Sequence, residues 1–274
     1  MANLGLETIP AKNFKRTNRH EGYKEFFSPE TGHMRYLSYG RLIFSDNINS
    51  HELSTGEREV VLFVINPGND GVNVEVAGES FSLGQYDMLY IPRGAKAAVS
   101  GSAKADVVVA GSKSEKDGKP QLVRYNDVKD DPDYFFDVGT AELGTQRRIF
   151  NMLGHNVDAS RLLAGFTMGQ PGAWTSWPPH EHHTSKEEFY LFFDMPAPAF
   201  SVQFVYSDVG DMEFSEVVQE GDCVTIPGGY HPTAAAPGYS SVFLWVMAGY
   251  DPEKDRDFKH GINIQPDYQA VKFL

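Results

Sequence analysis

Cysteine is nearly absent from the 274-residue sequence, in which Cys223 is the only one. A single thiol excludes an intrachain disulfide, which agrees with a reducing compartment and predicts a cytoplasmic location. Cys223 lies in the apolar run DCVTIP. We therefore interpret it as a small buried hydrophobic residue rather than a nucleophile.

Positive charge is also scarce, with 24 Lys and Arg residues against 37 Asp and Glu residues and a formal net charge of −13. Binding to nucleic acid depends on Lys and Arg side chains that neutralise phosphates, and binding to an anionic membrane surface has the same requirement. The composition therefore argues against both partners. A locally positive pocket can still bind a small anionic substrate.

Long apolar runs are missing as well. Residues 1–16, MANLGLETIPAKNFKR, lack the apolar core of a signal peptide. No stretch approaches the ~20 apolar residues of a membrane helix. With 41% hydrophobic and 22% charged residues, the composition is that of a globular protein with a buried core.

What the sequence does contain is a succession of short β-rich runs separated by Gly, Pro, Asn and Asp. The segment VNVEVAGESFSLG, residues 72–84, alternates between apolar and polar residues with the two-residue period of a half-buried strand. Convincing helical patterns are scarce. Many short strands at this spacing predict an all-β fold of the sandwich or barrel type.

An internal repeat indicates how the chain is divided. Residues 82–94 (SLGQYDMLYIPRG) and 219–229 (QEGDCVTIPGG) share a Gly, an Asp, an apolar strand and a Pro-x-Gly turn. We infer a duplicated β-domain. Its first half is predicted at 1–115, a polar connecting segment at 116–145, and its second half at 146–274.

Four residues of the second half have the composition and spacing of a metal site. His180 and His182 are two positions apart, so on a strand they face the same side, and Glu187 follows five positions later. His231 comes after a Pro-Gly-Gly turn and is expected from a neighbouring strand. Three imidazoles and one carboxylate suit Zn²⁺, Fe²⁺, Mn²⁺, Ni²⁺ or Co²⁺. We therefore predict that these four residues bind one divalent ion per chain.

Neighbouring residues of the same types are interpreted differently. By alternation, His183 and Glu188 face away from the predicted ligands, although a tilted loop would exchange Glu188 with Glu187 as the carboxylate ligand. The first half has no equivalent ligands, because the chain reads RGAKAA after Pro92, and His51 is interpreted as an isolated surface residue. The first half is therefore expected to be a metal-free partner that supplies packing and a surface for oligomer formation.

The motifs around these ligands resemble the cupin signature, G-x5-H-x-H-x3-4-E followed by G-x5-P-x-G-x2-H. The stretches TSWPPHEHHTSKEEFYLFFDMP and PGGYHPTAAAPGYSSVFLWVMAGYDP resemble the bacterial family that contains 5-deoxy-glucuronate isomerase and 4-deoxy-5-keto-uronate isomerase. The resemblance covers most of residues 36–262. It implies a bicupin, with two tandem jelly-roll-like β-sandwich barrels, zinc in the second half, and a homo-oligomer.

The same resemblance implies a reaction, a metal-dependent aldose–ketose isomerisation of a deoxy-uronate. GYHPTAAAPGY is similar to the 5-deoxy-glucuronate branch of inositol catabolism, which is the leading assignment. The short spacing from His182 to Glu187 and the sequence FFDMP are similar to the keto-uronate branch of pectin catabolism. In such a reaction a divalent ion stabilises an enediolate while a base and an acid move a proton between adjacent carbons.

Candidate acid–base groups near the ligands are Glu188, Tyr230 and Lys186, with a metal-bound hydroxide as the alternative base. Tyr190 is interpreted as core packing.

A substrate carboxylate requires a cation, and arginine binds it best because its guanidinium makes two parallel hydrogen bonds. Arg147 and Arg148, in TQRRIF, match a stretch of the family that enters the second barrel. Alternation along a strand allows only one of them to point inward. Gln203 matches a polar position on the inner sheet of the family and is the third candidate for substrate binding.

Two other function classes fit the same ligands. A cupin dioxygenase uses three histidines and a glutamate with Fe²⁺, and oxygen consumption separates it from an isomerase. A non-enzymatic sugar- or metal-sensing cupin is the third possibility, and no basic patch or DNA-binding helical segment supports it.

Overall fold

The computed structural model describes residues 9–208, 210 and 212–269, so the first eight residues of the N-terminal stretch discussed above lie outside it. Strands dominate the described residues, and no helix among them is long and apolar enough to cross a membrane. The predicted all-β fold is confirmed. The short helices are η1 (Pro29–Thr31), α1 (Tyr125–Val128) and η2 (Pro266–Tyr268).

The first half is a sandwich of two antiparallel sheets. Its larger sheet contains, in spatial order, β11 (Gln121–Val123), β8 (Met88–Ile91), β5 (Arg58–Asn66), β10 (Asp106–Lys113), β3 (Leu37–Ile43) and β2 (Gly22–Phe27). Its smaller sheet contains β4 (Ser50–Ser54), β9 (Lys96–Gly101), β6 (Val72–Val76) and β7 (Glu79–Leu83). The valines of β6 are buried and its polar residues are exposed, as the alternation of VNVEV predicts.

The second half is built in the same way. Its larger sheet contains β1 (Lys12–Phe14), β20 (Cys223–Ile226), β17 (Lys186–Phe192), β22 (Val242–Gly249), β14 (Leu162–Gly169), β13 (Arg147–Leu153) and β12 (Phe135–Val138). Its smaller sheet contains β15 (Trp174–Thr175), β21 (Thr233–Ala235), β18 (Ser201–Val205) and β19 (Phe214–Val218). A two-stranded ribbon joins β16 (His180–Glu181) to β23 (Asn263–Ile264).

The strand orders of the two halves repeat each other. The series β8-β5-β10-β3-β2 corresponds to β20-β17-β22-β14-β13, and β4-β9-β6-β7 corresponds to β15-β21-β18-β19. The pairing register fixes equivalent residues, because Val60 pairs with Ile91 and Glu188 pairs with Ile226, each isoleucine directly preceding the repeated Pro-x-Gly turn. Val60 of the first half is therefore the equivalent of Glu188 in the second.

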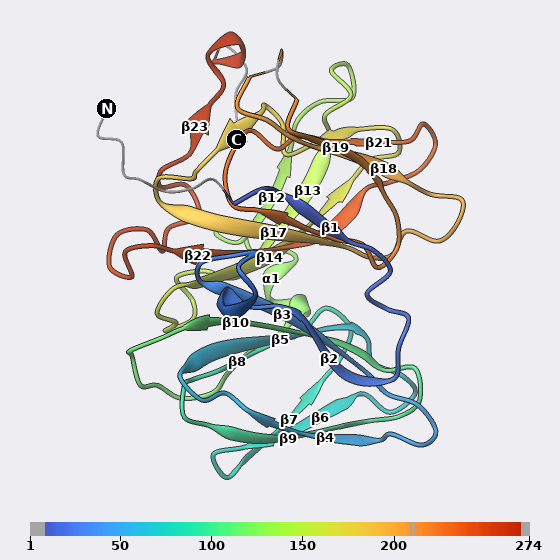
Figure 1. Ribbon diagram of the computed structural model, residues 1–274. Coiled ribbons are helices and arrows are strands. Elements are labelled where there is room, and N and C mark those ends of the chain that lie inside the picture. The colour runs from blue at the N-terminus through green and yellow to red at the C-terminus, as the bar shows by residue number, and fades with distance from the viewer. Residues whose placement is uncertain (1–8, 209, 211, 270–274) are drawn as a thin grey trace.

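The larger sheets of the two halves lie between the smaller ones and pack face to face (Figure 1). Aromatic residues from both sheets meet there, including Phe63 with Phe166 at 5.8 Å between ring centroids and Phe27 with Phe189 at 5.5 Å. Burial of these large side chains holds the two barrels together.

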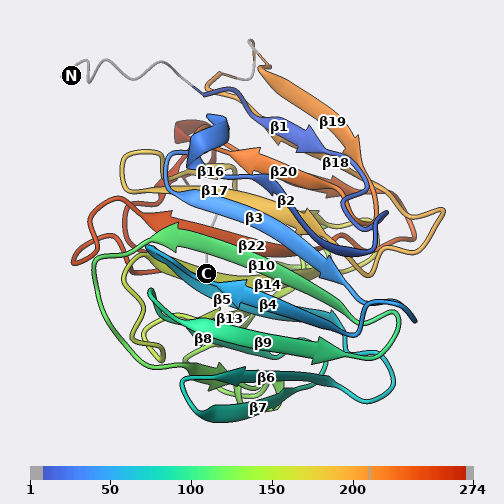
Figure 2. The same cartoon turned by 60° about the horizontal axis from the view of Figure 1, so that its bottom comes forward.

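Short strands also cross between the halves. β1, from the start of the chain, pairs with β20 of the second half, as Figure 2 shows. The segment 116–145, predicted to connect the halves, contributes β11 to the first large sheet and β12 to the second. Each half thus receives a strand from outside the repeated unit.

Candidate metal centre

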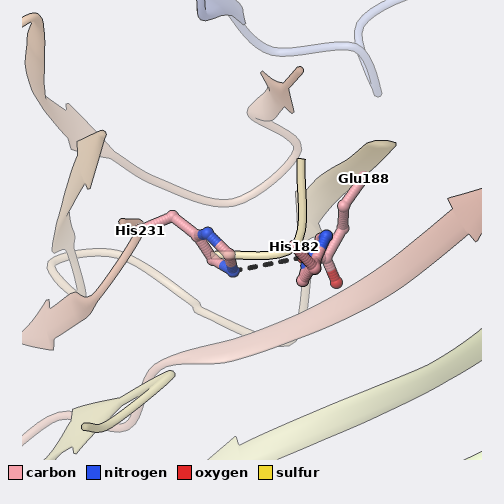
Figure 3. A group of neighbouring side chains, drawn as sticks. All are labelled: His182, Glu188 and His231. Carbon is pink, nitrogen blue, oxygen red and sulfur yellow. Dashed lines mark hydrogen bonds and ion pairs between the residues drawn. The ribbon is translucent and has the colours of Figure 1, made fainter. Parts of the chain in front are cut away.

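Three buried side chains of the second half converge on one point. His182, Glu188 and His231 each offer a ligand atom, and these atoms lie within 4.8 Å of one another (Figure 3). The Glu188 Oε2 atom is 3.1 Å from His182 Nε2 and 3.3 Å from His231 Nε2. His182 lies in the turn before β17, Glu188 is on β17, and His231 follows β20.

The imidazoles are held in a fixed orientation by the backbone. The Nδ1 atoms of His180, His182 and His231 lie 2.9, 3.3 and 2.8 Å from the carbonyl oxygens of Pro178, Lys186 and Gly229, respectively. A carbonyl can only accept, so each Nδ1 carries the proton and donates it. In the neutral form of such a ring the lone pair is on Nε2, which is the arrangement of metal-binding histidines.

His180 lies beside the three-residue cluster. Its ring centroid is 4.7 Å from that of His231 and 6.2 Å from that of His182. Burial, and after it the neighbouring His231 and His182, holds the pKa of His180 well below its usual value. The ring is therefore neutral at pH 7, as a metal ligand must be.

The carboxylate of the cluster is ionised. Burial of Glu188 opposes its ionisation, but its interactions with His182 and His231 outweigh burial and lower the Glu188 pKa to about 2. His231 Nε2 is a buried atom without a hydrogen-bond partner of acceptable geometry. An orphaned imidazole nitrogen beside a buried carboxylate and further histidines fits a divalent cation.

Glu187, predicted as the carboxylate ligand, points to the opposite face of β17, so that prediction is wrong. Its carboxylate accepts backbone N–H groups of the first half instead. Side chains begin to alternate between the two faces of β17 at Lys186, after the turn that contains His182. The number of residues between His182 and Glu187 therefore does not predict which face of β17 Glu187 occupies. Glu188, assigned to the other face and to acid–base chemistry, is the residue that joins the cluster.

Glu188 of the cluster and the neighbouring His180 line a cavity of about 40 Å³ that Arg147 also lines. The Arg147 guanidinium donates to the carbonyl oxygens of Thr145 at 2.9 Å and Trp177 at 2.5 Å. Burial lowers its pKa to about 10, which leaves it charged at neutral pH. Among the described residues, no carboxylate lies within ion-pair distance of Arg147, so this buried cation has no counter-charge.

Two hydroxyl groups of the cavity escaped the sequence-based prediction. The Tyr190 hydroxyl lies 2.8 Å from Ser176 Oγ, and both residues line the cavity. Tyr190 also stacks on Phe243 at 4.2 Å, so the interpretation as core packing describes the ring and misses the hydroxyl. The signal available in the sequence was its spacing, because Tyr190 is two positions after Glu188 and shares its face of the strand.

Two of the candidate substrate-binding residues lie outside the cavity. Arg148 is exposed, as alternation with buried Arg147 requires. Gln203 is fully buried, but its amide donates to the carbonyl oxygens of Phe204 at 2.9 Å and His231 at 3.1 Å. Gln203 therefore fixes the backbone that carries a cluster histidine, and it does not line the cavity.

The two remaining acid–base candidates also have other contacts. The ring of Tyr230 packs on Tyr206 at 5.8 Å, and its backbone pairs with the same residue. Lys186 is buried and its ammonium group donates to Ser185 Oγ and to the carbonyl oxygen of His260. Neither lines the cavity beside the cluster.

The first half has no comparable cluster among the residues that the structure describes. His51 is half-buried rather than fully on the surface, and its ring stacks on Tyr23 at 4.9 Å. Both residues line a cavity of about 340 Å³ between the two sheets of that half.

The sequence profile of the KduI/IolB family matches residues 15–264. The chain is 25% identical to 5-deoxy-glucuronate isomerase of Shouchella clausii over 249 residues, which cover 84% of this chain and 89% of that protein. It is 40% identical to the protein of the same name from Geobacillus kaustophilus over 111 residues, or 38% of this chain and 40% of that protein.

Solved structures agree on the fold. The crystal structure of an IolB-like protein from Salmonella typhimurium LT2 superposes with a TM-score of 0.80 at 23% identity, covering 95% of this chain and 98% of that one. An oxalate decarboxylase of Bacillus subtilis superposes with a TM-score of 0.64 at 14% identity, covering 97% and 82%. The predicted architecture of two tandem cupin barrels is confirmed.

Proposed function

The chain belongs to the KduI/IolB family and is an isomerase, and from that premise we propose that it is a metal-dependent aldose–ketose isomerase acting on 5-deoxy-glucuronate. One observation carries the proposal. One cavity is lined by Glu188 of the metal cluster, by His180 beside that cluster, and by a buried arginine without a counter-charge, Arg147.

His182, Glu188 and His231, with His180 beside them, are the residues that would bind the metal. A bound divalent ion supplies a Lewis acid that polarises a carbonyl and its neighbouring hydroxyl. The proposed ion is zinc, one per chain. The donor set of imidazoles and a carboxylate supports a divalent ion and also admits iron, manganese, nickel or cobalt.

Arg147 is the proposed partner of the substrate carboxylate. A buried charge without a counter-ion is costly, and an anionic ligand removes that cost. Two backbone carbonyls hold the guanidinium in place and leave its other N–H groups for the ligand. A carboxylate bound there fixes the orientation of the sugar acid relative to the cluster.

The hydroxyls of Tyr190 and Ser176 are proposed to bind the hydroxyl groups of the substrate. Burial keeps the pKa of Tyr190 well above its usual value, so the phenol stays protonated and can donate. The rings of Phe243, Trp245 and Phe258 line the rest of the cavity and exclude water.

The leading substrate is supported by the relatives named 5-deoxy-glucuronate isomerase, and 4-deoxy-5-keto-uronate is the alternative. A homo-oligomer in the cytoplasm is part of the same proposal. The location is supported by the single cysteine.

The test is a turnover assay with each of the two deoxy-uronates, run without oxygen on zinc-loaded protein and on the same protein after chelation. We expect turnover of 5-deoxy-glucuronate that requires the metal and proceeds without oxygen. Turnover of 4-deoxy-5-keto-uronate alone would assign the protein to the keto-uronate branch of the family. Dependence on oxygen, or no turnover of either acid by the zinc-loaded protein, would overturn the isomerase proposal.

A further inference from the structure

Glu187 connects the metal-bearing strand to the first half of the chain. Its side chain is fully buried on the face of β17 opposite Glu188. Its Oε1 atom accepts the backbone N–H groups of Tyr36 and Leu37, both at 2.7 Å, and its Oε2 atom accepts that of Arg35 at 2.9 Å. These three donors lead into β3 of the first half.

The first half makes the reciprocal contact. Glu59 on β5 is also fully buried, and its carboxylate accepts the backbone N–H groups of Ser160 at 2.6 Å, Arg161 at 2.6 Å and Leu162 at 2.9 Å. These donors lead into β14 of the second half. The two glutamates occupy equivalent positions, because Glu59 precedes Val60 as Glu187 precedes Glu188.

Each carboxylate therefore satisfies three backbone donors of the opposite half. Buried N–H groups need such partners, since an unpaired one costs the full desolvation of the group. The two contacts form a reciprocal pair, although Glu59 also accepts the hydroxyl of Tyr90 at 3.1 Å. Only Glu187 is adjacent in sequence to a residue of the metal cluster.

We infer that Glu187 is a positioning residue, which anchors β17 to β3 of the first half and thereby holds the Glu188 carboxylate in line with His182 and His231. The inference rests on the proposed metal site. It gives the first half, which has no ligands of its own, a part in holding that site.

The mechanism is geometric. Adjacent residues of a strand point to opposite faces, so a hydrogen-bonded anchor on one face fixes the position of the side chain on the other. Groups that orient metal ligands without touching the metal contribute strongly to metal affinity. Glu59 has the same kind of anchor, but its neighbour Val60 has no ligand atom to position.

The experiment compares Glu187→Gln with Glu59→Gln, the matched control. Each glutamine removes one charge and sets an N–H donor against backbone N–H donors, so both variants are expected to lower the melting temperature by similar amounts. Zinc affinity, measured by competition with a chromophoric chelator, separates them. We expect the Kd for zinc to rise about 10-fold or more in Glu187→Gln and to stay within about twofold of wild type in Glu59→Gln.

Equal changes in zinc affinity in the two variants, or none in Glu187→Gln, would overturn the inference while leaving the metal site intact. Absence of zinc binding by the wild-type protein would instead overturn the proposed function. If a glutamine variant does not fold, Glu187→Asp and Glu59→Asp replace the pair, because aspartate keeps the charge and shortens its reach by one methylene group. The same difference in zinc affinity is then expected.

Discussion

The two halves of the chain share one strand order, and they differ at the positions where a metal would bind. Val60 stands in the first half where Glu188 stands in the second. Counted from the repeated proline, Lys96 stands where His231 does, and its side chain is exposed. The fold thus provides a scaffold that both halves possess, and a few side chains near strand ends decide which half has a site.

The two halves also differ in the size of their cavities. In the first half, Val109 and Gly111 line a cavity of about 340 Å³. At the equivalent places in the second half, Trp245 and Met247 reduce the cavity to about 40 Å³. Larger side chains bring the walls close to the histidine and glutamate cluster, and this lowers the local dielectric and strengthens its electrostatic interactions.

The largest effect is expected from removing a ligand. His231→Ala deletes an imidazole of the cluster and should lower activity by about 1,000-fold or more, because the Lewis acid is lost with the metal. Lys96→Ala changes the equivalent position of the first half and should leave activity near that of the wild type. Steady-state assays on zinc-loaded proteins measure both, and similar losses in the two variants would contradict the assignment of the site to one half.

A smaller effect is expected at the neighbouring arginines of β13. Arg147→Ala removes the buried cation and should lower kcat/KM by about 100-fold, since hydrogen bonds to charged groups contribute about 1.5–3 kcal/mol. Arg148→Ala changes an exposed side chain on the other face and should have little effect. Zinc content should be unchanged in both variants. If Arg148→Ala had the larger effect, the proposed carboxylate site would be wrong.

The next effect in size concerns the hydroxyls of the cavity. Tyr190→Phe removes a neutral hydroxyl that can donate to substrate and should lower kcat/KM by about 10-fold, with zinc affinity retained. Tyr90→Phe is the control in the first half, because it removes a hydroxyl that donates to buried Glu59 at 3.1 Å. Full activity of Tyr190→Phe would show that this hydroxyl does not contact the substrate.

The smallest effect is expected on assembly. The predicted homo-oligomer uses a surface of the first half, which has no metal ligands, so chelation should leave the molecular mass unchanged. Light scattering should give a multiple of the 30.5 kDa chain mass before and after chelation. A monomer in both conditions would refute the oligomer, and dissociation on chelation would place the interface at the metal-bearing half.

Much of the fold and part of the metal centre could be predicted from the sequence. The repeated Pro-x-Gly turn predicted a duplication, and the spacing of His180, His182 and His231 predicted the histidines that the fold brings together. Alternation predicted that only one of Arg147 and Arg148 points inward. These features depend on local periodicity, which a strand preserves.

The rest depends on contacts between distant segments. Glu187 was predicted as the carboxylate ligand because alternation was extended from His182 through a turn into β17. The face that each side chain of β17 occupies is set by the pairing of β17 with β20 and β22. The partners of Glu187 are backbone N–H groups about 150 residues away. Every residue except proline has such a group, so the sequence does not indicate which of them Glu187 contacts. The crossing strands β1, β11 and β12 are too short to show a period.

The stoichiometry and place of the bound ion test the central claim most directly. Elemental analysis of protein purified with zinc and then desalted should give one equivalent per chain for the wild type and for Lys96→Ala, and none for Glu188→Ala. Two equivalents in the wild type, none in the wild type, or one retained by Glu188→Ala would contradict a single metal centre built around Glu188 in the second half.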